Sequence, residues 1–108
     1  MRAIWIDDQG ISELDIETDW QRHSSIRWEA FELTDTHVGW TDEVGLLRPD
    51  PLIATFSNGQ RIALPVLILG RDRDMTVAAT MTNAELGAMV ILEQNPVAWR
   101  QARSGLGR

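Results

Sequence analysis

The sequence predicts an α+β fold: a mainly antiparallel sheet of about five to seven short strands, packed against one buried C-terminal helix and a shorter terminal helix. Three observations favour this class. Residues 11–19 alternate apolar and acidic side chains, which is the period of a half-buried strand. Asn58-Gly59 separates two β-prone runs, as in a tight hairpin. Thr82 and Glu85 have the spacing of a capping box, which marks the start of a helix.

The first half of the chain is predicted to form short strands joined by turns. Residues 2–7 and 11–17 form a hairpin across Asp8-Gln9-Gly10, because this segment has turn composition between two β-prone runs. Trp28 and Phe31 lie in the third strand, and Thr34-Asp35-Thr36 is the turn that follows it. The remaining strands outside the Asn-Gly hairpin are expected at residues 26–33, 37–41 and 75–80.

The hairpin at residues 52–64 is the clearest local prediction. If Asn58 and Gly59 occupy a two-residue type I′ turn, Thr55 faces Ile62 and Ile53 faces Leu64. The apolar run continues past Pro65, which belongs at an edge, at a bulge or at a strand end because it lacks a backbone donor. A strand that is apolar on both faces needs a cover. We expect that cover from the C-terminal helices or from a second copy of the chain, so the strand at 62–69 is a candidate homodimer contact.

Two helices are expected at the C-terminus. From Asn83 to about Gln94 the apolar side chains nearly encircle a helical projection, which predicts a buried helix. Asn95-Pro96 ends this helix and can begin a second one as N-cap and first helical residue. The second helix is expected to end at Ser104-Gly105.

Composition indicates one globular domain spanning residues 1–108. Apolar residues make up 44% of the chain, and there is no cysteine, which excludes disulfides and thiolate metal sites. All ten basic residues are arginine, so no lysine is available for a Schiff base or a phosphate-binding loop. No apolar run is long enough for a signal peptide or a membrane helix, which predicts a cytoplasmic protein.

The formal charge of −6 is unevenly distributed along the chain. Residues 1–50 carry twelve acidic and four basic side chains, whereas residues 51–108 carry four acidic and six basic ones. Such asymmetry can steer a charged partner. It disfavours direct binding to nucleic acid, which requires a basic patch.

The strongest functional signal is an acidic ladder, made of Glu13, Asp15, Glu17 and Asp19 at every second position. On a strand these carboxylates would point the same way at intervals of roughly 7 Å. One interpretation is the solvated face of an antiparallel sheet. The other is a contact surface that competes for arginine and lysine side chains. Trp20 directly follows the ladder, and an exposed tryptophan there would anchor such a contact.

We therefore expect a small acidic, non-enzymatic binding protein that docks on the basic surface of a nucleic-acid-binding protein, with no cofactor. It would act as a nucleic-acid mimic, in the manner of the anti-CRISPR-like inhibitors that phages and mobile elements encode. The predicted partner-binding residues are Glu13, Asp15, Glu17, Asp19 and Trp20.

Two alternatives remain open at the level of sequence. One is a small-molecule or metal-dependent enzyme or sensor that uses Asp7, Asp8, Asp35 and His37, although their spacing matches no zinc motif. The other is a structural subunit that self-assembles. The chain contains no nucleophile elbow and no glycine-rich phosphate loop, so we predict no catalytic residues.

Overall fold

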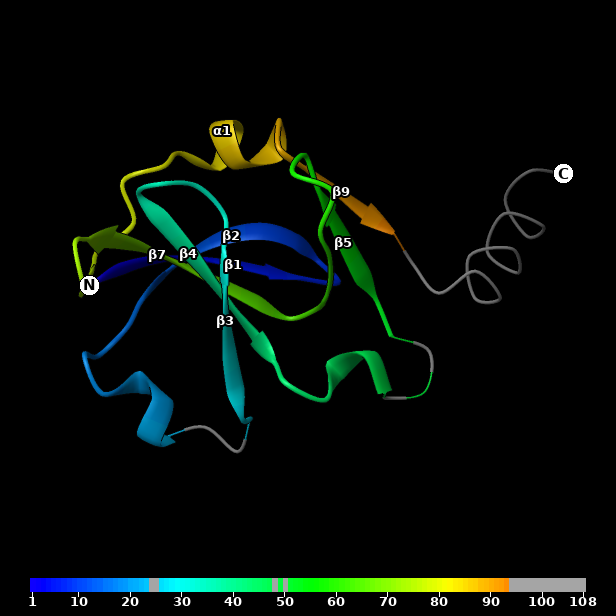
Figure 1. Ribbon diagram of the computed structural model, residues 1–108, viewed down its shortest axis with the longest axis horizontal. Coiled ribbons are helices and arrows are strands. Elements are labelled where there is room, and N and C mark those ends of the chain that lie inside the picture. The colour runs from blue at the N-terminus through cyan, green and yellow to red at the C-terminus, as the bar shows by residue number, and fades with distance from the viewer. Residues whose placement is uncertain (24–25, 48, 50, 94–108) are drawn as a thin grey trace, which may run out of the picture.

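A computed structural model describes residues 1–23, 26–47, 49 and 51–93, and its strands form two antiparallel sheets (Figure 1). The larger, sheet A, has the order β2-β1-β7-β4-β3, with β8 paired to the C-terminal end of β7. Its strands are β1 (Arg2–Asp7), β2 (Gly10–Asp15), β3 (Trp28–Glu32), β4 (His37–Asp42), β7 (Val66–Asp72) and β8 (Met75–Val77). The smaller, sheet B, has the order β6-β5-β9, with β5 (Ile53–Phe56), β6 (Arg61–Ala63) and β9 (Val90–Glu93).

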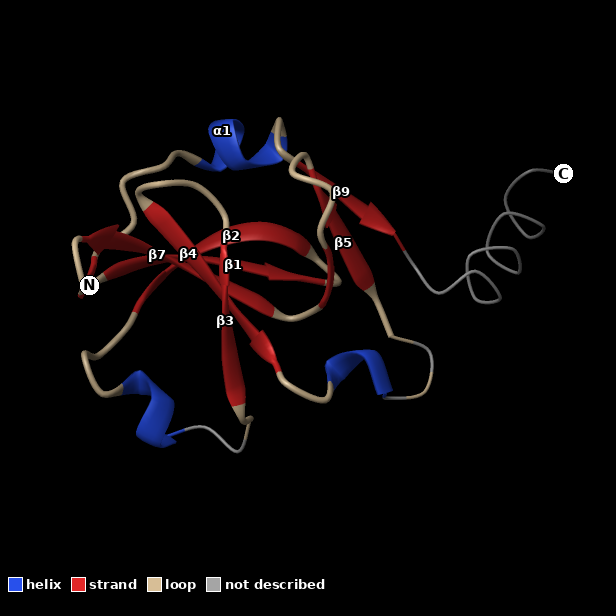
Figure 2. Ribbon diagram, in the orientation of Figure 1, coloured by secondary structure: helices blue, strands red, loops and turns tan. Residues whose placement is uncertain are grey.

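The main core lies on one face of sheet A, where sheet B and the short helix α1 (Asn83–Gly87) pack (Figure 2). It joins Ile4 and Ile68 of sheet A to Phe56 of sheet B and Leu86 of α1, all of them fully or almost fully buried. Two short 3-10 helices, η1 (Trp20–His23) and η2 (Gly45–Leu47), lie in the connections.

A smaller cluster lies on the opposite, outer face of sheet A. Ala3, Leu67 and Leu69 form its buried part, and Trp20 from η1 packs against it together with Trp40 and other half-buried side chains. The β2–β3 connection therefore covers part of this face with the indole ring of Trp20.

The predicted N-terminal hairpin and the next two strands are confirmed. β1 and β2 pair across a turn at Asp8-Gln9, and β3 pairs with β4. Pro65 lies at a strand end, between β6 and β7. β7 is the centre of sheet A, paired with β1 and β8 along one edge and with β4 along the other.

The central position of β7 gives most of the predicted strand at 62–69 a cover within the chain, and a homodimer contact through this strand stays a prediction. Its apolar residues, including Val66 and Leu69, are buried within the chain. The two hydrophobic clusters, one on each face of sheet A, therefore cover this strand.

The Asn58-Gly59 hairpin exists, but its predicted register was wrong by one residue. Thr55 pairs with Arg61 and Ile53 with Ala63, so the loop contains three residues. Of the three loop residues only Gly59 has positive φ, at 90°, and its N–H donates to the Phe56 carbonyl. This is the alternative three-residue solution, a type I turn followed by a left-handed glycine, and it does not need positive φ at Asn58.

Replacing Gly59 with alanine is expected to lower the free energy of unfolding by about 1 kcal/mol, because a Cβ at positive φ is strained. No heavy atom lies within 4 Å of the new Cβ, so crowding would not add to the loss. Urea unfolding measures this change, and equal stability of G59A and wild type would contradict the turn geometry.

The predicted fold class is wrong: the described residues form nine strands in two sheets instead of one sheet of about five to seven strands, and the one described α-helix has only five residues. Thr82 and Glu85 do form the capping box, but α1 covers only Asn83–Gly87, and Val90–Glu93 is strand β9 instead of helix. β9 pairs with β5, with Val90 opposite Phe56. The apolar run at 89–92 fits either period, and its β-branched residues together with the free edge of β5 favour the strand.

The second predicted helix lies outside the described residues. No helix in the described part of the chain is long and apolar enough to span a membrane.

Candidate functional site

The acidic ladder is shorter than predicted, because β2 ends at Asp15. Glu13 pairs with Ile4 in the β1–β2 register, so the acids of β2 lie on the core side of sheet A, at its edge. Leu14 points the other way and is 39% exposed. Glu17 and Asp19 follow the strand and do not continue its alternation.

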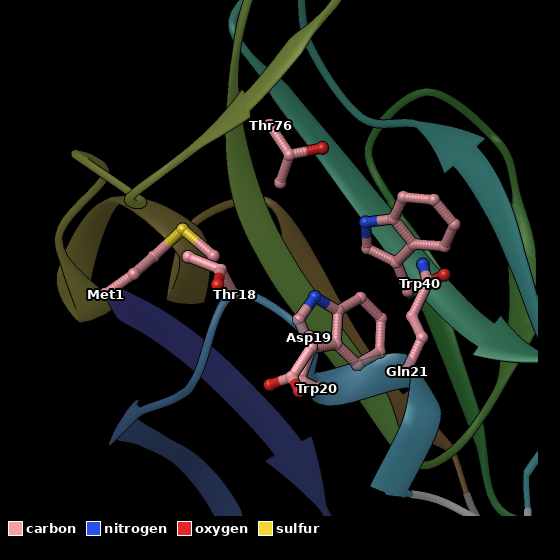
Figure 3. Close-up of a pocket in the computed structure, with 7 residues that line it drawn as sticks. All are labelled: Met1, Thr18, Asp19, Trp20, Gln21, Trp40 and Thr76. Carbon is pink, nitrogen blue, oxygen red and sulfur yellow. The ribbon is translucent and has the colours of Figure 1, made fainter.

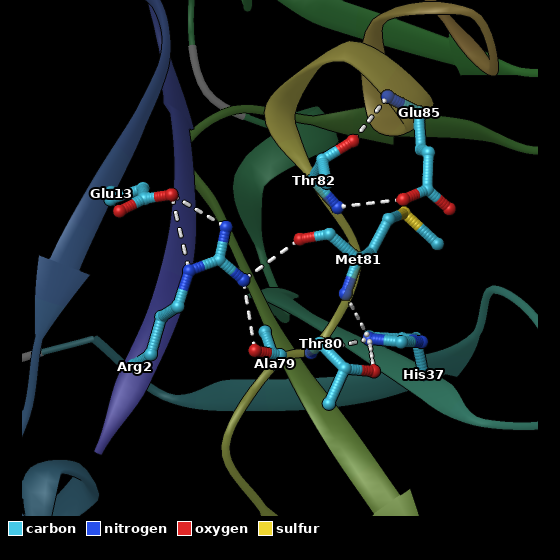
Figure 4. A network of polar contacts seen from close by, with 8 residues as sticks. All are labelled: Arg2, Glu13, His37, Ala79, Thr80, Met81, Thr82 and Glu85. Carbon is cyan, nitrogen blue, oxygen red and sulfur yellow. Dashed lines mark hydrogen bonds and ion pairs between the residues drawn. The ribbon is translucent and has the colours of Figure 1, made fainter.

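Glu13 is bound within the chain by Arg2 (Figure 4). The guanidinium donates to Glu13 Oε1 from Nε and Nη2 at 3.1 and 2.6 Å, and Nη1 donates to the carbonyls of Ala79 and Met81 at 2.8 Å each. The hydrogen bonds and charge of Arg2 lower the pKa of Glu13. Glu13 thus orients a structural arginine that holds the segment between β8 and α1.

Asp15 is paired as well, with the N-terminal ammonium group. The two groups lie 2.6 Å apart, and this hydrogen bond and charge lower the pKa of the Asp15 carboxyl, although its side chain is 91% exposed. Two of the four ladder carboxylates are therefore neutralised by cations of the same molecule.

Asp19 and Trp20 lie at a cleft on the outer side of sheet A (Figure 3). The cleft has a volume of about 530 Å³ and is formed by the β2–β3 connection, the N-terminus, β4 and β8. Its lining residues are Met1, Thr18, Asp19, Trp20, Gln21, Trp40 and Thr76. Glu17 precedes this lining and has an exposed side chain without an ion-pair partner among the described residues.

Trp20 belongs to a chain of edge-to-face tryptophans. Its ring centroid lies 5.3 Å from that of Trp28 and 5.6 Å from that of Trp40, and Trp28 contacts Trp5 at 6.4 Å. Such contacts fix the ring orientations. The Nε1 atoms of Trp28 and Trp40 are buried without an acceptor in the described structure. Trp20 is consequently a half-buried wall of the cleft, and not the freely exposed anchor that the sequence suggested.

The part of the chain that carries the cleft has an excess of acidic residues. Residues 1–93 contain sixteen acidic and seven basic side chains. Besides Arg2, Arg71 pairs with Glu32 at 2.9 Å, and Arg27 lies 3.8 Å from Glu43. Because several of the few cations are already paired, the field of the folded part is dominated by carboxylates.

The residues of the metal-site alternative do not come together. Asp7 accepts from Trp5 Nε1 and from the Gln9 N–H in the β1–β2 turn, Asp35 is exposed in the β3–β4 turn, and His37 is buried. Within the described ranges no three His, Asp or Glu side chains form a group that could hold a metal ion.

His37 has a structural role instead (Figure 4). It is 3% exposed, and its Nε2 accepts from the backbone N–H groups of Thr80 and Met81 at 3.1 Å each. The neutral ring therefore carries its proton on Nδ1, which lies 3.0 Å from Thr36 Oγ1. Burial lowers the pKa of His37, so the neutral form that these bonds require is the favoured one.

Several cleft residues could not be identified from sequence. The alternation at 37–41 puts Val38 and Trp40 on one face, and this is the one local signal that could have selected Trp40. Gln21 directly follows Trp20 in η1, whereas Met1 and Thr76 are brought to the cleft by the pairing of β1 with β2 and of β8 with β7. Comparison of the chain with known proteins gave no match: no family model, curated protein or solved structure matches it.

Proposed function

We propose that the chain is a small non-enzymatic binding domain that docks on a basic protein surface. The contact lies at the mouth of the cleft lined by Trp20 and Trp40, here called the tryptophan cleft. The observation that carries this proposal is the position of Asp19 and Trp20 on the cleft; the exposed Glu17 lies two residues before Asp19 in the sequence. Carboxylates at the rim steer a cationic partner, and a tryptophan wall supplies the apolar contact that holds it.

The contact differs from the ladder expected from sequence. Glu13 and Asp15 are engaged by Arg2 and the N-terminus, so a row of four free carboxylates does not support the proposal. The binding surface that we propose is defined by position instead: Asp19 and Trp20 line the cleft, and the exposed Glu17 lies two residues before Asp19 in the sequence.

The class of partner that we propose is a nucleic-acid-binding protein. Its phosphate-binding arginines and lysines form a basic groove, which an acidic domain of this size can occupy in place of nucleic acid. Inhibition by nucleic-acid mimicry, as in anti-CRISPR-like proteins, would follow from such occupancy.

A salt-dependent capture experiment tests the proposed function. The chain is immobilised and incubated at low salt with a panel of purified nucleic-acid-binding proteins, which are then eluted with rising salt or with DNA. A specific partner should elute in both cases, because salt screens the exposed charges and DNA competes for the same groove.

A charge-matched pair of variants identifies the surface. The double variant E17Q/D19N should weaken binding roughly two- to thirtyfold, since each exposed ion pair contributes about 0.2–1 kcal/mol. The control D8N/D35N removes the same charge from two hairpin turns and should bind as wild type does. Equal loss in both would show that net charge alone governs capture, and no loss in E17Q/D19N would overturn the proposal.

A further inference from the structure

We infer that the tryptophan cleft receives an arginine side chain of the partner, whose guanidinium group stacks on indole and donates hydrogen bonds to Asp19. This inference rests on the proposed function, because it names the chemical group that the cleft recognises on the basic surface.

The cleft combines the two features that a guanidinium group requires. Trp20 and Trp40 supply aromatic surface, and tryptophan is the strongest cation–π partner among the side chains. The polar lining residues Thr18, Asp19, Gln21 and Thr76 all carry oxygen acceptors. A guanidinium group has five donors and no acceptor, so an oxygen-rich lining suits it.

Electrostatics favours a cation over an anion or a neutral ligand. Among the described lining residues there is no arginine, and the ammonium group of Met1 is matched by the Asp15 carboxylate 2.6 Å away. The Asp19 carboxylate has two oxygens and about four acceptor sites, so it can accept from a ligand in addition to the interactions that it makes within the chain.

The rings are organised before the ligand arrives. Trp20 packs edge to face against Trp40, the other aromatic lining residue, and against Trp28, which is not among the described lining residues, so these contacts hold the rings of the cleft wall in place. In Figure 3 the indole rings of Trp20 and Trp40 lie on the same side of the cleft as Gln21, facing Met1 and Thr18. A fixed wall lowers the ordering cost of binding. Arginine is favoured over lysine because its planar group stacks on a ring and donates in the same plane.

Three peptides test this inference by nuclear magnetic resonance. Each has one central residue between glycines, namely arginine, lysine or citrulline, which is the uncharged planar isostere of arginine. The probes are titrated into the ¹⁵N-labelled full chain, and the indole N–H signals are assigned with single Trp→Phe variants. The arginine peptide should shift the signals of Trp20 and Trp40, and citrulline should bind about five- to thirtyfold more weakly.

Two variants localise the effect and separate it from folding. D19N should remove most of the preference for arginine over citrulline, whereas D8N should preserve it, and thermal unfolding of both variants confirms that they fold. Equal shifts with arginine and citrulline, or shifts that spare Trp20 and Trp40, would overturn the inference.

Failure of the inference is distinguishable from failure of the proposed function. If the peptides do not bind the cleft but E17Q/D19N still loses the captured partner, the docking surface stands and the arginine site falls. If the captured partner is retained equally by E17Q/D19N and wild type, the docking surface itself falls.

Discussion

Replacing His37 with alanine is expected to lower the free energy of unfolding by about 2–5 kcal/mol at pH 7.5. The imidazole Nε2 accepts from two backbone N–H groups, those of Thr80 and Met81, and the variant leaves both without this acceptor at a site where His37 itself is buried. The bond from Met81 is buried and the bond from Thr80 is part-buried. An unpaired buried donor costs about 1–3 kcal/mol, and the lost ring adds a cavity. Urea unfolding measures the loss as a lower midpoint concentration, provided that the m-value of the variant equals that of wild type.

The same residue should make stability depend on pH. Burial is the main cause that lowers the pKa of His37 in the folded state; the positive charge of Arg2 also lowers it, and the negative charge of Glu85 raises it. The unfolded chain then binds a proton more readily than the folded one. The contribution of His37 is therefore complete above the unfolded pKa of 6.5 and is lost as the pH falls toward the lower folded value.

The variant H37Q separates titration from packing. Glutamine retains an acceptor but no titratable group, so its stability should change less than that of wild type between pH 7 and pH 5. The lowered pKa values of Glu13 and Asp15 act at more acidic pH, below their ordinary values of 4.5 and 3.8. The same slope in both proteins over pH 5–7 would assign the pH dependence to other groups.

Local patterns in the sequence identify most strands, because each strand needs only its own alternation and the turn beside it. The β1–β2 hairpin follows from the polar turn at Asp8-Gln9, and β4 follows from the apolar residues around Trp40. The sequence predicts less well which residues of two strands pair. The register of the Asn58-Gly59 hairpin depends on whether one loop residue or two have positive φ, and both turn types suit the same dipeptide.

The C-terminal correction has a non-local cause. The segment Met89–Leu92 is apolar at every position, so neither the helical nor the strand period distinguishes it. What decides is the edge of β5, which needs a partner and is 30 to 40 residues away in sequence. The capping box at Thr82 was predictable because it is contained within four residues.

The candidate site was predictable only in part. Asp19 and Trp20 are adjacent in sequence and do lie at the cleft, whereas Trp40 and Thr76 reach it through the pairing of β4 and β8 with β7. The ladder prediction treated the second strand alone and did not use its pairing with the first, which brings Arg2 next to Glu13.

Replacing Gly70 with alanine is expected to destabilise the protein by about 1–3 kcal/mol or more, which is the cost of overpacking a well-packed site. Gly70 is buried in β7 and pairs with His37 on one side and Val77 on the other. An added Cβ would overlap the carbonyl oxygen of Ala78 and lie 3.0 Å from Val77 Cγ2. A backbone atom cannot change rotamer, so β8 must shift away from β7.

Gly87→Ala is the matched control, because the nearest atom to its new Cβ is Ile11 Cδ1 at 4.0 Å and its φ is not in the left-handed region. Alanine in place of this helical glycine should stabilise the protein by about 0.5–1 kcal/mol. Denaturant midpoints of both variants are compared with that of wild type.

Because the chain after β8 is the segment that His37 and Arg2 hold, G70A should also weaken those bonds, and the pH dependence between pH 5 and pH 7 should become shallower. If G70A unfolds at the same midpoint as wild type, the close approach of β7 to the β8 connection is not a feature of the protein in solution.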